Sequence, residues 1–240
     1  MERKHFLKSL FVGAISTPAL LSACGKESEE VTPTTGTTGT TGTGTSGSCA
    51  VAPTETEGPF PTKAPASYVR SDITDGKSGH KMTAKLTITN TNSNCAALAG
   101  ALVDIWHCDA EGNYSEYGGS GMQSTNYQSV HFLRGRQITD ANGQVVFTTI
   151  FPGWYSGRAT HIHVHIYSAS GTSLKVTQIA FPEGTGTAVA AVNGYAKGMN
   201  GYTSNAKDNV FSDGVTQELA TVTGSTTAGF ELTISLGVAA

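Results

Sequence analysis

Residues 160–167 constrain the fold more than any other segment, because polar and apolar side chains alternate strictly along them. Side chains of a β-strand point in turn to opposite faces, so three histidines share one face and three aliphatic residues share the other. The two sets are His161, His163 and His165, and Ile162, Val164 and Ile166. An apolar face needs a core to cover it, whereas a row of imidazoles needs solvent or a metal ion. The segment predicts a half-buried strand with a candidate metal-binding face.

The same alternation recurs through the rest of residues 49–240. It predicts further strands over residues 81–90, 101–107, 144–150, 174–181 and 229–237, and Asn142-Gly143 is the hairpin signal before the third of these. Only residues 188–195 show a turn or two of helical periodicity. We therefore expect one all-β domain at residues 49–240, folded as a β-sandwich.

The N-terminal residues resemble an export signal. Basic residues precede an apolar run at 11–21 that is too short to span a bilayer, and the run ends in Leu21-Ser22-Ala23-Cys24, which looks like a lipobox. We expect residues 1–23 to be a signal peptide and Cys24 to be lipidated; a signal peptide with an incidental cysteine is the alternative. Residues 24–48, rich in Thr, Gly and Ser, then form a disordered tether. The expected location is extracytoplasmic, anchored to a membrane and either periplasmic or on the cell surface.

Charge and cysteine content set further bounds. A formal net charge of −3 and the absence of a basic cluster argue against nucleic acid as a partner. Besides Cys24 the chain has Cys49, Cys95 and Cys108, and two of these three could pair in an oxidising compartment. The sequence leaves both the pairing and the oligomeric state open.

Two tyrosines suggest which metal ion the histidines hold. Tyr114 and Tyr155 each end a glycine-containing turn, while Tyr117 and Tyr127 lack that spacing and are alternatives to Tyr114. Phenolate is a hard anionic ligand that favours a highly charged ion such as Fe(III). Two phenolates and a hydroxide would neutralise Fe(III), which matters because an uncompensated buried charge costs several kcal/mol.

Four motifs, in order, carry a resemblance to a known family. They are WHCDAEGNY at residues 106–114, GRQITD at 135–140, TIFPGWY at 149–155 and RATHIH at 158–163. Together with an N-terminal arm, TEGPF at 56–60, they look like the core of the intradiol ring-cleavage dioxygenases, the catechol and protocatechuate dioxygenases. The resemblance covers residues 54–178 and implies a β-sandwich of the prealbumin-like type with Fe(III) as cofactor.

The resemblance also implies roles for single residues. Tyr114 and His163 match the equatorial iron ligands, and Tyr155 and His161 match the axial ones. A catechol would bind through both oxygens and displace the Tyr155 phenolate, which takes up a proton, and O2 would open the ring to a muconate-type diacid. The substrate partners are then a catechol and O2.

Five more positions match the substrate pocket of the family. Arg158 corresponds to an arginine that stabilises negative charge on the ring, and Gln178 corresponds to a glutamine beside it. The remaining matches, in a segment that lines the pocket, are Gly58, Pro59 and Phe60.

Several positions depart from the family pattern. Only Ser156 and Gly157 separate Tyr155 from Arg158, so we expect a more open pocket. Phe60 stands where a tyrosine is common, and Ala159-Thr160 replaces the usual proline. His165 is an extra histidine that we expect to be an exposed strand residue.

Two other functions fit the same residues. One is a non-catalytic extracytoplasmic sandwich that binds a metal or a catechol; the other is a copper or zinc protein built on the His-x-His strand. Substrate identity is also open, because Lys63, Arg70 and Arg136 could each meet a carboxylate and none is singled out by the sequence.

Overall fold

The alternating segments form strands in the computed structural model, which describes residues 50–240. Within that range there are nine strands, one short α-helix and four 3-10 turns. Their bounds are η1 (Pro65–Ser67), β1 (Lys81–Asn90), η2 (Thr91–Ser93), β2 (Ala96–Ala97), β3 (Leu102–Trp106), β4 (Arg134–Ile138), β5 (Gln144–Ile150), β6 (His161–Tyr167), β7 (Ser173–Ala180), α1 (Ala188–Val192), η3 (Tyr195–Lys197), η4 (Asn205–Lys207), β8 (Thr221–Ser225) and β9 (Gly229–Val238). The predicted signal peptide, the Cys24 lipidation site and the tether lie outside the described residues.

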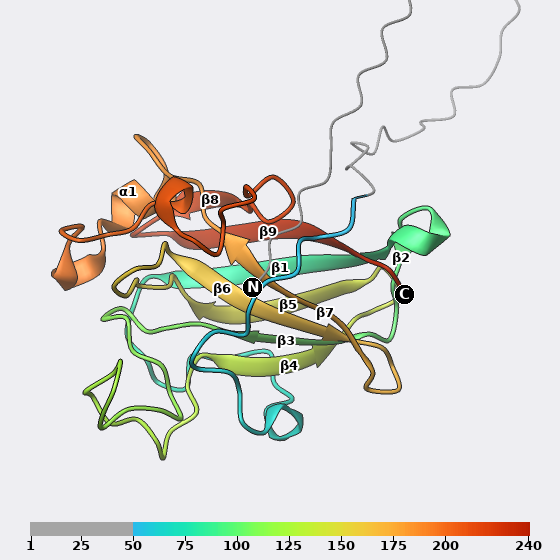
Figure 1. The fold of residues 1–240 in the computed structure, drawn as a ribbon, viewed down its shortest axis with the longest axis horizontal. Coiled ribbons are helices and arrows are strands. Elements are labelled where there is room, and N and C mark those ends of the chain that lie inside the picture. The colour runs from blue at the N-terminus through green and yellow to red at the C-terminus, as the bar shows by residue number, and fades with distance from the viewer. Residues whose placement is uncertain (1–49) are drawn as a thin grey trace, which may run out of the picture. The chain divides into compact units, whose positions relative to one another are not determined.

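The strands form two sheets that face each other (Figure 1). The first has the order β2-β1-β9-β8, with β5 also paired to β1, and the second has the order β4-β3-β6-β7. All pairs are antiparallel except β1 with β9. The all-β sandwich expected from the sequence is confirmed.

The core lies between the sheets and follows the period of two. On β1 the inward residues Met82, Ala84, Leu86 and Ile88 are each 1% exposed or less. On the facing sheet the inward positions are Val103 and Ile105 from β3 and Ile162, Val164 and Ile166 from β6. Because these residues fill the core, the histidines of β6 point to the outer face of the second sheet.

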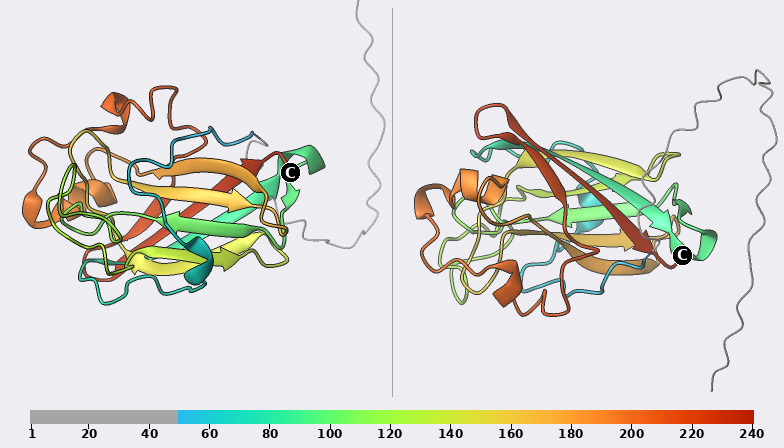
Figure 2. Two further views of the ribbon diagram at one scale, coloured as in Figure 1. Left: turned by 60° about the horizontal axis from the view of Figure 1, so that its bottom comes forward. Right: turned by 90° about the horizontal axis from the view of Figure 1, so that it is seen from above.

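The longest loops gather at one end of the sandwich. They follow β3, β5 and β7, and both views of Figure 2 place them at the end opposite the C terminus. β6 begins at that end, so His161 and His163 enter the sheet directly under these loops. This arrangement brings segments that are distant in sequence to one place.

The predicted strands agree with the structure to within a residue or so at each end, and β1 and β5 agree at every residue. The helical periodicity at 188–195 corresponds to α1 and η3. Three strands were not predicted from the sequence: β2, β4 and β8. In β8, Thr221–Ser225 has no buried residue, so its side chains show no apolar face; it pairs with β9, and only the half-buried Val222 packs against the core.

The two cysteines within the described residues differ in their bonding state. Cys95 is disulfide-bonded, and Cys108 is a buried free thiol.

Among residues 50–240 there is no helix long and apolar enough to cross a membrane.

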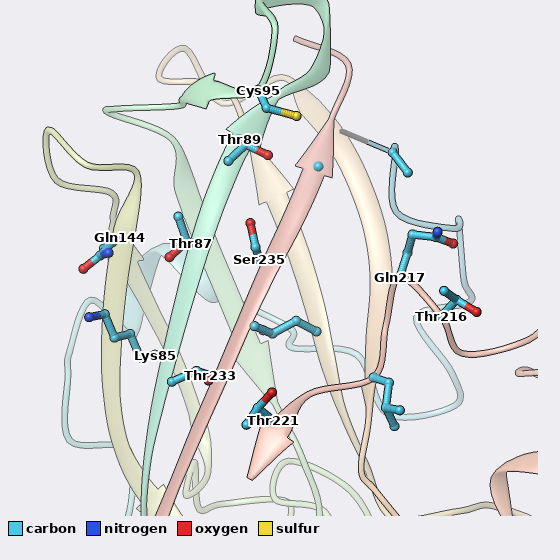
Figure 3. A pocket seen from close by; sticks show the side chains of 14 residues that line it. Lys85, Thr87, Thr89, Cys95, Gln144, Thr216, Gln217, Thr221, Thr233 and Ser235 are labelled. Carbon is cyan, nitrogen blue, oxygen red and sulfur yellow. The ribbon is translucent and has the colours of Figure 1, made fainter. Parts of the chain in front are cut away.

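A groove of about 890 Å³ lies over the outer face of the first sheet (Figure 3). Hydroxyl side chains of β1 and β9 line it, among them Thr87, Thr89, Thr233 and Ser235. None of the predicted site residues within 50–240 borders this groove.

Candidate metal centre

The N-terminal arm, taken here as residues 55–60, runs along the second sheet beside β6 and β7 (Figure 1). It lies on the outer face, to which the histidines of β6 point. Its Glu55 N–H donates to the Val176 carbonyl at 3.0 Å, and its Thr56 carbonyl accepts from Gln178 Nε2 at 2.8 Å. Further along, the Phe60 carbonyl accepts from Arg134 Nη1 at 3.0 Å. The arm therefore converts an outer sheet face into a buried site.

Four predicted side chains meet beneath this arm. His161 and His163 come from β6, Tyr114 from the loop after β3 and Tyr155 from the loop after β5. The two histidine Nε2 atoms are 3.1 Å apart, and Tyr114 Oη lies 3.2 Å from His161 Nε2. The Tyr155 ring centroid is 5.6 Å from that of His161 and 5.7 Å from that of Tyr114.

The imidazoles are neutral in this setting. Burial, reinforced by the Arg158 charge, lowers the pKa of His161 to about 3. Burial, then the neighbouring His161, lowers the pKa of His163 well below its usual range. His161 Nδ1 lies 2.7 Å from the Ala159 carbonyl, so it carries the ring proton and leaves Nε2 bare toward the cluster.

The phenols hold their protons until a cation arrives. Burial is the main cause that raises the pKa of Tyr114 well above its usual range, and burial also raises the pKa of Tyr155. A metal ion would supply the charge that makes a buried phenolate favourable. The described residues contain no cluster of three or more His, Cys, Asp or Glu side chains at metal-binding spacing. A metal ion at this cluster would therefore need the two phenolates as ligands in addition to the two imidazoles. Such a donor set suits Fe(III).

Close packing fixes the orientation of His163 and Tyr114. Trp106 stacks on His163 with a centroid separation of 4.8 Å and an interplanar angle of 3°. On the arm, Gly58 approaches so closely that a Cβ there would lie 2.9 Å from His163 Cε1. Phe60 stacks on Tyr114 at 4.7 Å. Of the three arm residues predicted to line the pocket, Gly58 and Phe60 therefore contact candidate ligands, while Pro59 is exposed.

The guanidinium group of Arg158 lies beside the cluster of tyrosines and histidines. Its Nη1 lies 3.5 Å from both Tyr155 Oη and His161 Nε2. Its Nη2 donates to Gln178 Oε1 at 2.5 Å, which places the predicted glutamine beside the predicted arginine. Its Nε donates to both carboxylate oxygens of Asp208, at 2.9 and 2.8 Å. Sequence reasoning missed Asp208, because no local pattern links it to a residue 50 positions earlier.

The other candidate side chains have different surroundings. Tyr117 Oη donates to the Pro61 carbonyl at 2.7 Å, and Tyr127 packs edge-on against Phe132 at 5.0 Å, so Tyr114 is the tyrosine that reaches the histidines. The expectation that His165 is simply exposed was wrong. Its side chain is 12% exposed, with Nδ1 3.0 Å from Glu57 of the arm.

Fold and cluster together define a class of protein: a β-sandwich that carries two phenols, two imidazoles and an arginine on the covered face of one sheet. Comparison with known proteins identifies the class. A family model described as Dioxygenase matches residues 57–213. The chain belongs to the intradiol ring-cleavage dioxygenase family.

Individual relatives agree with this assignment. Catechol 1,2-dioxygenase of Acinetobacter baylyi is 31% identical over 148 residues, which is 53% of this chain and 45% of that protein. Chlorocatechol 1,2-dioxygenase of Rhodococcus opacus is 29% identical over 103 residues, 35% of this chain and 37% of that protein. The chain thus matches less than half the length of either relative. An intradiol ring-cleavage dioxygenase structure from Tetranychus urticae superposes with a TM-score of 0.69 and 28% identity, covering 79% of this chain and 95% of that one.

Proposed function

We propose that this chain is a non-haem Fe(III) dioxygenase that cleaves a catechol ring with O2 between the two hydroxyl-bearing carbons, giving a muconate-type diacid. The observation that carries the proposal is the convergence of Tyr114, Tyr155, His161 and His163 in a buried site faced by Arg158. Family membership supports the same reaction class.

Each residue of the site has a distinct role in the proposed reaction. Bound Fe(III) would supply the Lewis acidity that holds both catechol oxygens and the redox chemistry with O2. Tyr155, which is less buried than Tyr114, is the phenol placed to exchange a proton with an incoming hydroxyl. Arg158 Nη1 faces the same point and stabilises negative charge as it develops on the ring. The arm and Phe60 exclude water from this side of the cluster.

The surroundings favour a catechol without a carboxylate. The three cations that the sequence left as candidates to meet a carboxylate are each engaged elsewhere: Lys63 Nζ donates to the Glu116 carbonyl at 2.8 Å, and Arg136 binds both oxygens of Asp104. Arg70 Nε donates to the Arg134 carbonyl at 2.9 Å. Releasing any of them would cost the existing hydrogen bonds, so protocatechuate is the disfavoured substrate.

Metal loading and oxygen uptake test the proposal. The purified chain loaded with Fe(III) is expected to be red from tyrosinate-to-iron charge transfer, and to consume O2 with catechol or hydroxyquinol faster than with protocatechuate. Mass spectrometry should show a product equal to substrate plus O2. His163→Ala is expected to lose iron, whereas Tyr155→Phe keeps iron, changes colour and turns over slowly. Wild-type iron content and activity in His163→Ala would refute the assignment; catechol binding without O2 uptake would indicate a binding protein.

We also propose that the enzyme is exported and held to a membrane by lipid on Cys24. The lipobox-like Leu21-Ser22-Ala23-Cys24 and the apolar run before it support this proposal. Metabolic labelling with a fatty acid should mark the wild-type chain and not Cys24→Ala. Equal labelling of both chains would exclude Cys24 as the acceptor.

A further inference from the structure

The segment between Tyr155 and His161 is held by a loop from much later in the chain. Ala159 N–H donates to Asp208 Oδ2 at 2.8 Å, and Thr160 N–H donates to Tyr202 Oη at 3.2 Å. Asp208 and Tyr202 both belong to the excursion between β7 and β8. The backbone that leads into the candidate ligand His161 is thus fixed at two successive amides.

Asp208 also binds the side chain that faces the cluster. Its side chain is fully buried, and the carboxylate accepts from Arg158 Nε, from the Ala159 amide and from the Val210 amide. A buried carboxylate with this many donors is fully satisfied and well oriented. By occupying Nε, it leaves Nη1 of Arg158 to face Tyr155 and Nη2 to meet Gln178.

A second path leads from Asp208 to His161. Ala159 donates its N–H to Asp208 at 2.8 Å and accepts from His161 Nδ1 through its carbonyl at 2.7 Å, so the backbone of one residue links the carboxylate to the imidazole. The carbonyl holds the ring proton on Nδ1 and so keeps Nε2 bare for a metal. Hydrogen bonds of this kind to a ligand histidine set its orientation and its tautomer.

We propose that Asp208 is the positioning residue of this metal centre. Asp208 orients His161 through the backbone of Ala159 and orients Arg158 through Nε, so one carboxylate positions both a metal ligand and the charge-stabilising group. The effect on turnover rests on the proposed function, whereas the effect on metal affinity and on the metal-free protein does not.

Tyr202 completes the restraint. Its hydroxyl donates to Glu183 Oε1 at 2.6 Å and accepts from Thr160 N–H. The residue directly before His161 is therefore also held by a hydrogen bond from the later loop.

The test compares Asp208→Asn with Asp213→Asn, which removes the same charge from an exposed position a little further along. In the iron-free protein, hydrogen exchange at Arg158 Nε and at the Ala159 amide, followed by NMR, is expected to quicken about tenfold or more in Asp208→Asn. Iron affinity, measured by competition with a chelator, should fall by roughly 10- to 100-fold. In the loaded enzyme kcat should fall while KM changes little. Asp213→Asn should match the wild type in each measurement.

Two further variants keep the proposal testable if Asp208→Asn does not fold. Asp208→Glu keeps the charge but moves the carboxylate, and is expected to weaken iron binding; an unchanged affinity would overturn the proposal. Tyr202→Phe should speed exchange at the Thr160 amide alone and leave Arg158 Nε protected. Wild-type exchange and iron affinity in Asp208→Asn would overturn the positioning role even in an active enzyme. A wild type that binds iron but cleaves no catechol would overturn the proposed function and not this role.

Discussion

Gly58→Ala is the substitution whose effect follows most directly from the geometry. Gly58 has φ of +68°, a conformation that costs an L-residue roughly 1–2 kcal/mol. In addition, the new Cβ would lie 2.9 Å from His163 Cε1, whereas ordinary contact begins near 3.4 Å. His163 stacks on Trp106 at 4.8 Å, so the ring has little room to retreat.

Gly171→Ala is a matched control for the backbone cost. Gly171 has φ of +87° in the turn between β6 and β7, and a Cβ there would meet nothing within 4 Å. Gly171→Ala is therefore expected to lower the free energy of unfolding by about 1 kcal/mol. Gly58→Ala should lower it by about 3 kcal/mol, because overpacking adds to the backbone strain.

Urea denaturation of the iron-free protein measures both values, and chelator competition measures iron affinity. Displacement of His163 by a few tenths of an ångström is expected to weaken iron binding about tenfold in Gly58→Ala, with no change in Gly171→Ala. Equal destabilisation by the two substitutions, together with wild-type iron affinity in Gly58→Ala, would show that the arm does not set the position of His163.

Two predictions concern the pH dependence of the iron-free protein. Burial lowers the pKa of His107 to about 4, so the stability that this neutral histidine contributes is present above pH 6.5 and is lost as the pH falls toward 4, by roughly 3 kcal/mol. His161 and His163, whose pKa values burial also lowers, contribute to the same slope. His107→Gln should therefore reduce the slope of that part of a urea-midpoint profile without removing it, and an unchanged slope would contradict the assignment. Burial raises the pKa of Glu218 to about 7, so stability through this group falls as the pH rises from 4.5 to 7. Glu218→Gln should remove this fall, and a profile with the wild-type slope over that range would show that Glu218 ionises normally.

The sequence by itself determined the strands and the faces of their side chains. Alternation is a local property with a period of two, so His161 and His163 had to share a face opposite Ile162 and Val164 wherever β6 was placed. The same reasoning failed for β2, which has two residues, for β4, whose burial does not alternate, and for β8, whose side chains carry no apolar face.

Only the tertiary structure decided what meets the histidines. The outer face of the second sheet became a buried site because the arm crosses it, and Tyr114 reached His161 across 47 positions because the loop after β3 folds over the same end. Asp208 came to Arg158 from 50 positions away in a segment with no recognisable pattern. Contacts of this kind depend on how loops pack against a finished sandwich, and neither the period of a strand nor the chemistry of a single residue specifies that packing.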